Sequence, residues 1–185
     1  MGKRSDFDRI PRDFYPTPES AVLPLLEHIT DVNWFDEPCA GDGALIEHFK
    51  KYGFRCNSAS DLEPQAEGII KQDALTTTEC RGDCFITNPP WARPILHPLI
   101  THLSDIAPTW LLFDADWAHT KQAAPFANRC RKIVSVGRVK WIPDSKHTGK
   151  DNCAWYLFDS PNRETDVGWG TISPGCTEFY FRSES

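Results

Sequence analysis

The feature that most constrains the fold is the repeated order of apolar run, turn and helical segment. The stretch VNWFDEPCAGDGALIEHFKKYG predicts a strand around residues 32–37, a glycine-punctuated turn at 40–43, and a helix that closes at Gly53. Alternating strands and helices are typical of a parallel sheet covered by helices. We therefore expect an α/β protein.

Further strands are predicted where short apolar or β-branched runs meet turn-forming residues. These runs are RCNSASDLEP, DCFITNPPW, TWLLFDADW, KIVSVGRVKWI and CAWYLFD. A helix is predicted in TPESAVLPLLEHIT, with Thr17 as its N-cap and Pro18 at its first helical position. The other helices are expected to be shorter, and the tail from Arg163 onward is assigned to no element.

Length and composition indicate one globular domain spanning residues 1–185. No run reaches the roughly 18 apolar residues of a membrane span, and MGKRSDFDRI lacks the apolar core of a signal peptide. The seven cysteines are an odd, scattered set, which favours thiols, and their spacing predicts no metal site. We expect a cytoplasmic protein without a membrane partner.

Charge is unevenly distributed along a chain whose net charge is -6. Residues 129–150 hold a single acid, Asp144, against seven basic residues: Arg129, Arg131, Lys132, Arg138, Lys140, Lys146 and Lys150. Such a window can form a basic face that attracts nucleic acid. A solvated strand and loop would have the same composition, so charge alone leaves both interpretations open.

The loop DEPCAGDG has two glycines that would let the backbone approach a ligand closely. The third glycine of a pyrophosphate-binding loop is absent. Asp36, Glu37 and Asp42 would repel phosphate but attract a sulfonium or an ammonium group. The loop therefore favours a cationic or zwitterionic ligand, although short G-x-G turns also occur for structural reasons alone.

Two acids follow this loop at informative positions. Asp61 ends the second predicted strand about 20 residues after the glycine turn, where an acid receives ribose hydroxyls in nucleoside-binding units. Asp73 could accept a hydrogen bond from an adenine amino group. Each acid could instead be a simple helix cap.

The stretch FITNPPWARP ends a predicted strand on a side-chain amide, two prolines and an aromatic residue. The oxygen of Asn88 and the carbonyl of Pro89 could accept the two protons of an exocyclic amine, while Trp91 could stack on the ring that carries it. An Asn-Pro turn without a ligand is the alternative.

In this order, the motifs DFYPTP, DEPCAGDG, SDLEP, QDAL and NPPW resemble those of the S-adenosylmethionine-dependent amino-group DNA methyltransferases. The resemblance covers roughly residues 13–118, and it is strongest to the small adenine-N6-specific enzymes of bacteriophages and bacteria. It implies a Rossmann-like class I methyltransferase fold, with a mostly parallel central sheet flanked by helices, and S-adenosylmethionine as cofactor.

The resemblance also implies roles for individual residues. Catalysis would fall to Asn88, Pro89, Pro90 and Trp91, by direct transfer without a covalent enzyme intermediate. The cofactor-binding residues would be Tyr15, Thr17, Pro18, Glu37, Pro38, Cys39, Gly41, Gly43, Asp61, Leu62, Asp73, Ala74 and Asn88. Cys39 lies within the glycine loop and is expected to be a small pocket residue, not a nucleophile.

No separate target-recognition domain fits in this length, so nucleic-acid contact is expected from the loop at residues 137–152 or from a partner subunit or second copy. The candidate residues there are Arg138, Lys140, Trp141, Lys146, His147 and Lys150. So small a contact region predicts a short recognition sequence or relaxed sequence specificity. DNA is the expected polymer, and RNA adenine, a protein glutamine amide, or a non-catalytic subunit with the same fold remain open alternatives.

Overall fold

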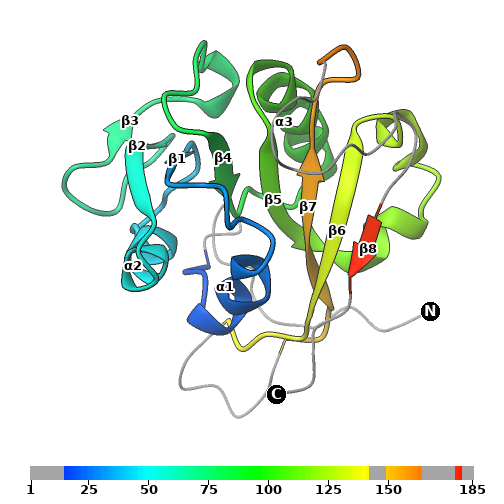
Figure 1. Cartoon of the computed structure of the whole chain (residues 1–185), viewed down its shortest axis with the longest axis horizontal. Coiled ribbons are helices and arrows are strands. Elements are labelled where there is room, and N and C mark those ends of the chain that lie inside the picture. The colour runs from blue at the N-terminus through cyan, green and yellow to red at the C-terminus, as the bar shows by residue number, and fades with distance from the viewer. Residues whose placement is uncertain (1–14, 142–148, 164–177, 181–185) are drawn as a thin grey trace.

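The computed structural model describes residues 15–141, 149–163 and 178–180, which build one mixed sheet of eight strands in the order β3-β2-β1-β4-β5-β7-β6-β8. The strands are β1 Trp34–Glu37, β2 Arg55–Asp61, β3 Ile70–Lys71, β4 Cys84–Thr87, β5 Thr109–Asp114, β6 Cys130–Gly137, β7 Cys153–Phe158 and β8 Glu178–Tyr180. Only β7 runs antiparallel to its neighbours, β5 and β6 (Figure 1). The α/β class and the mostly parallel sheet are confirmed.

Helices flank this sheet. The α-helices are α1 Glu19–Leu26, α2 Ala44–Lys51 and α3 Arg93–Ile106, and the 3₁₀ helices are η2 Ala74–Thr76, η3 Ala115–His119 and η4 Ala124–Phe126. Within the described ranges, no helix has the length and apolar content needed to span a membrane.

Two predictions about elements were wrong, and a short strand was missed. The N-cap of α1 is Pro18, whose extended backbone (φ -74°, ψ 150°) leaves the helix to begin at Glu19, so Thr17 is not the cap. The helix α3 is 14 residues long, although its region was expected to hold only a short helix. The two-residue strand β3 was not predicted at all.

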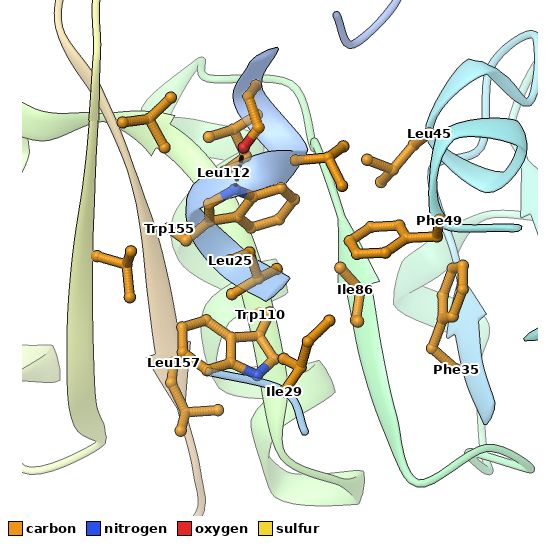
Figure 2. Close-up of a cluster of buried hydrophobic side chains, with 14 of the residues drawn as sticks. Leu25, Ile29, Phe35, Leu45, Phe49, Ile86, Trp110, Leu112, Trp155 and Leu157 are labelled. Atoms are coloured by element: carbon orange, nitrogen blue, oxygen red, sulfur yellow. Dashed lines mark hydrogen bonds between the residues drawn. The ribbon is translucent and has the colours of Figure 1, made fainter. Parts of the chain in front are cut away.

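The core lies on both faces of the sheet because side chains alternate along each central strand. Trp110 and Leu112 of β5 face the layer of α1 and α2, while Leu111 and Phe113 face α3. Figure 2 shows Leu25 of α1 packed against the first of these faces. Burying each such side chain contributes about 2 kcal/mol, so the two layers hold the sheet rigid between them.

Strand direction decides where the loops gather. Because β1, β4, β5 and β6 run parallel to one another, their carboxyl ends lie at one edge of the sheet. The reversed β7 begins at that same edge, so residues 138–141 after β6 and 149–152 before β7 also lie there. The glycine loop, the NPPW stretch and these described parts of the predicted nucleic-acid loop therefore share one edge, which is where ligands bind in open α/β sheets.

Candidate active site

The glycine loop is held in shape by backbone geometry and by one acid. Gly41 and Gly43 have positive φ angles of 55° and 81°, a conformation that favours glycine. Gly41 N donates to Asp61 Oδ2 at 2.8 Å, and Ala40 N donates to the Ser60 carbonyl at 2.9 Å. The end of β2 therefore fixes the loop from which α2 starts.

Glu37 ends β1 beneath this loop and is 2% exposed. Its Oε2 atom has no hydrogen-bond partner among the described residues. Burial raises the pKa of the Glu37 carboxyl well above its ordinary value, and the charges of Asp42 and Asp61 raise it further. A buried carboxyl oxygen without a partner among the described residues is free to accept a hydrogen bond from a ligand.

Two more residues of the motif lie beside Glu37. Pro38 is buried and Cys39 is half-buried. Burial, followed by the charges of Asp61 and Glu37, raises the pKa of the Cys39 thiol to about 12. Cys39 therefore stays protonated near neutral pH, which agrees with a pocket residue and not with a nucleophile.

The two strand-end acids differ in what they hold. Both oxygens of Asp61 accept backbone N–H groups, from Gly41 and from Glu63 at 2.8 Å each. The exposed Asp73 caps η2 by accepting from Leu75 N at 2.9 Å. Each carboxylate keeps lone pairs free for a further donor, so these contacts leave the predicted ligand roles open.

Two predicted neighbours of these acids lie in contrasting surroundings. Leu62 is exposed, with 52% of its surface accessible, as an uncovered ligand-contacting residue would be. Ala74 is buried in the hydrophobic layer under α3. A direct ligand contact therefore fits Leu62 better than Ala74.

Asn88, directly after β4, is held by hydrogen bonds to both ends of its amide. Its Nδ2 donates to Thr17 Oγ1 at 3.1 Å, and its Oδ1 accepts from Trp91 Nε1 at 3.2 Å. Trp91 Nε1 also donates to the Leu112 carbonyl at 3.1 Å, which ties the motif to β5. These contacts were not predicted, since the sequence indicated only that Trp91 could stack on a ring.

An aromatic cluster joins three segments that are distant in the sequence. The ring centroids of Trp91 and Trp141 are 5.7 Å apart in an edge-to-face arrangement, and those of Tyr15 and Trp141 are 6.4 Å apart. Tyr15 comes from the N-terminal motif and Trp141 from the predicted nucleic-acid loop. The structure thus brings residues of both segments to the NPPW stretch. Pro89 is buried and Pro90 is half-buried in that stretch, and Pro18 of the N-terminal motif is also half-buried.

The basic window is only partly available to a ligand. Arg129 NH1 lies 2.6 Å from Asp105 Oδ1 in an ion pair. Arg131 is 4% exposed on β6. Two of the seven basic residues are therefore used inside the protein, which a count of charges could not reveal.

The remaining basic residues lie close to Trp141. Arg138, Lys140 and Lys150 are exposed on the segments that leave β6 and approach β7. Lys146 and His147 lie outside the described residues. In the part of the chain that the structure describes, no three side chains gather in a way that could hold a metal ion.

One pair of residues at this edge was not singled out from the sequence. Arg93 NH2 of α3 lies 3.1 Å from Asp114 Oδ2, at the carboxyl end of β5. The sequence does contain both charges: Asp114 ends a buried strand in FDAD, and Arg93 lies two residues after Trp91. Neither charge has a recognisable motif of its own.

Comparison with known proteins gives a likeness in fold. No protein-family model and no curated protein sequence matches the chain. A candidate class I S-adenosylmethionine-dependent methyltransferase from Listeria monocytogenes matches 91% of this chain and 66% of its own length, with a TM-score of 0.57 and 13% identity. Its likeness, together with the strand order and the reversed β7, decides the fold.

The chain has the class I methyltransferase fold. Other structures with this likeness include a candidate RNA methyltransferase from Pyrococcus horikoshii, with a TM-score of 0.53 and 18% identity over 78% of this chain and 85% of that one. The M protein of the type I restriction enzyme EcoKI has a TM-score of 0.53 and 11% identity over 89% of this chain. The chain spans 48% of that M protein. The class I methyltransferase fold expected from the motifs is thus confirmed.

Proposed function

We propose that this protein is an S-adenosylmethionine-dependent methyltransferase that methylates the exocyclic N6 amine of adenine in DNA. The observation that carries the proposal is the held amide of Asn88, which lies at the same sheet edge as the glycine loop over Glu37, whose Oε2 atom has no partner among the described residues. One group is suited to an amine and the other to a cation. A methyl donor with a positive charge and an amine acceptor need such a pair of sites.

The residues of the glycine loop fit this cofactor. S-adenosylmethionine carries a sulfonium and an ammonium group, and it supplies the methyl group as an electrophile when bound. The orphaned Oε2 of Glu37 offers a buried acceptor for positive charge. Gly41 and Gly43 leave the loop without side chains where a ligand would approach, and Asp61 lies beside them with lone pairs for hydroxyl groups.

The NPPW residues fit the acceptor. The Oδ1 atom of Asn88 uses one lone pair for Trp91 and keeps a second for an amine proton. Because the indole N–H of Trp91 can only donate, it fixes the position of the Asn88 oxygen, while Thr17 holds the Nδ2 end. Trp91 and Trp141 provide aromatic surface for a planar ring. These residues orient an amine for direct transfer, and the protonated Cys39 has no part in it.

The exposed cations beside Trp141 favour a polyanion as the carrier of the adenine. Arg138, Lys140 and Lys150 can contact phosphates next to the aromatic cluster. An RNA adenine or a protein glutamine amide presents a similar planar amine. The experiment must therefore compare polymers directly.

The test measures cofactor binding and methyl transfer separately. Calorimetry should show S-adenosylmethionine binding, and labelled-methyl transfer should be followed on duplex DNA, single-stranded DNA, RNA and total protein in parallel. We expect label at adenine N6 in DNA. Label in RNA or protein alone would replace the proposed substrate, and absence of cofactor binding would reject the enzyme activity itself.

Asn88→Ala tests the role of the amide, with the exposed Asn128→Ala as the matched control. Loss of a positioned hydrogen-bonding group of this kind lowers kcat by about 100-fold or more. We expect that loss for Asn88→Ala, with cofactor affinity within about three-fold of the parent protein. Asn128→Ala should retain full activity, and an equally active Asn88→Ala would remove Asn88 from the reaction.

A further inference from the structure

We propose that a pocket beside the NPPW stretch binds a nucleotide that flanks the target adenine. This inference rests on the proposed function, because it concerns the same substrate. The pocket is a wide, open hollow of about 480 Å³ between the first turns of α3 and the segment around η4. Its lining residues are Arg93, Pro94, His97, Pro98, Gln122, Pro125 and Phe126.

The chemistry of the lining suits a planar, mostly apolar ring with a few polar edges. Three prolines and Phe126 supply rigid apolar walls, and the exposed Gln122 supplies an amide donor and acceptor. Aromatic side chains stack on bases of any sequence, and each stacked base adds measurably to affinity. A nucleobase therefore fits this lining better than an isolated phosphate does.

His97 is a neutral wall of the pocket. Its Nε2 atom lies 3.1 Å from Trp117 Nε1, and because an indole N–H can only donate, Nε2 must be the acceptor. Burial, followed by the charge of Arg93, lowers the pKa of His97 and keeps the ring uncharged. The His97 and Phe126 ring centroids are 4.9 Å apart and the rings are tilted by 50°, so the two rings contact each other in the lining.

Arg93 supplies the one positive charge among the lining residues. Its NH2 atom is engaged by Asp114 and its NH1 atom is buried, while 28% of the side chain is exposed and can face a ligand. An arginine offers five donors in a planar fork that suits phosphate oxygens. Asp114 fixes the guanidinium and offsets its charge, so Arg93 fits one phosphate of the bound nucleotide and not a broad basic patch.

The pocket lies within reach of a strand whose adenine occupies the target site. Trp91 is tied to β5 at Leu112 and Arg93 is tied to it at Asp114. Two residues along a strand span about 7 Å. The pocket therefore begins next to the NPPW stretch, and we expect it to receive a nucleotide one or two positions from the adenine.

Photo-crosslinking of the unaltered protein tests this placement. Single-stranded DNA oligonucleotides with one target adenine would carry 5-iodouracil at each flanking position in turn. We expect crosslinks to the tryptic peptide QAAPFANR, which contains Phe126, from one or two positions next to the adenine. Crosslinks confined to other peptides, or DNA that does not bind, would overturn the proposal.

A variant pair provides a second measurement that does not depend on catalysis. Phe126→Ala should weaken oligonucleotide binding, measured by fluorescence anisotropy, by about ten-fold, while the exposed neighbour Lys121→Ala should change it by less than about three-fold. Equal affinities of the two variants would contradict the inference. If cofactor binding and methyl transfer are absent but the QAAPFANR crosslink forms, the proposed activity fails and the nucleotide site stands.

Discussion

At the scale of single residues, Glu37 shows a conflict between stability and binding. Its carboxyl group is buried, one of its oxygens has no partner among the described residues, and two further acids raise its pKa. A buried group of this kind costs free energy that a cationic ligand can return. The residue is thus suited to a binding role more than to a role in folding.

Glu37→Gln should be more stable than the parent protein in the absence of ligand, and this difference should grow as pH rises. The pKa of Glu37 in the folded state lies above its ordinary value of 4.5, so above that pH the unfolded carboxyl ionises while the folded one keeps its proton. The free energy of unfolding therefore falls with pH until the folded pKa is passed. The glutamine variant lacks this fall and should gain at least about 1 kcal/mol at neutral pH.

Urea unfolding between about pH 5 and about pH 8 measures this difference, with the exposed Glu67→Gln as control. The same Glu37→Gln variant should bind S-adenosylmethionine at least about ten-fold more weakly. Identical pH slopes for the parent and the Glu37→Gln protein would show that the carboxyl is solvated in the folded state.

The sequence could predict which residues gather at the candidate site but not how they hold one another. Asn88 and Glu37 each end a recognisable strand, and parallel strands bring such ends together. The hydrogen bond from Trp91 to Asn88 depends on a side-chain rotation that no spacing encodes. Likewise, the ion pair that occupies Arg129 joins residues of α3 and of the segment before β6, so only tertiary structure reveals it.

At the scale of elements, prolines and packing explain what was missed. Pro94 lies in the first turn of α3, where its missing N–H would have no partner in any case. Pro98 lies inside the helix and would normally end it, but the buried side chains of Leu96, Leu99 and Leu103 hold α3 against the sheet. Apolar burial outweighs the lost hydrogen bond, so α3 continues through Pro98.

Gly149 packs tightly against the segment that carries Trp141. Gly149 N donates to the Val139 carbonyl at 2.8 Å, and a Cβ atom at Gly149 would lie 3.0 Å from that oxygen and 3.1 Å from the Trp141 ring. Trp141 in turn contacts Trp91 at the candidate site. Only a residue without a side chain leaves this arrangement undisturbed.

Gly149→Ala should therefore displace Trp141 and weaken DNA binding by several-fold, with cofactor affinity unchanged. Its expected destabilisation is about 1 kcal/mol. Gly53→Ala is the matched control, because its positive φ of 88° gives a similar cost with no atom near the added methyl group. Anisotropy and thermal unfolding of both variants check this, and equal DNA affinities would separate Trp141 from substrate binding.

At the scale of the whole molecule, Arg163 connects the chain directly after β7 to the end of α3. Its Nε donates to Asp159 Oδ1 at 2.6 Å, and its NH2 donates to the carbonyls of Ser104 and Asp105. Those carbonyls belong to the last turn of α3, where helix acceptors lack internal partners. One guanidinium thus satisfies a buried carboxylate and a helix terminus together.

Arg163→Ala should lower the free energy of unfolding by about 2 kcal/mol or more, since it leaves Asp159, 3% exposed, without its ion-pair partner. Arg81→Ala removes an exposed ion pair with Glu79 and should cost less than about 1 kcal/mol. Chemical denaturation of both variants measures the difference. Similar losses for the two would mean that Asp159 finds another donor.

The reversed strand β7 also determines when the sheet can be completed during synthesis on the ribosome. The apolar β5 can pair with β4 as soon as it emerges, but its other edge must wait for residues 153–158, after the whole of 115–152 has been made. An apolar strand with an open edge readily pairs with other chains. Nascent chains that stall before β7 should therefore aggregate, whereas those that complete it close the sheet within their own sequence.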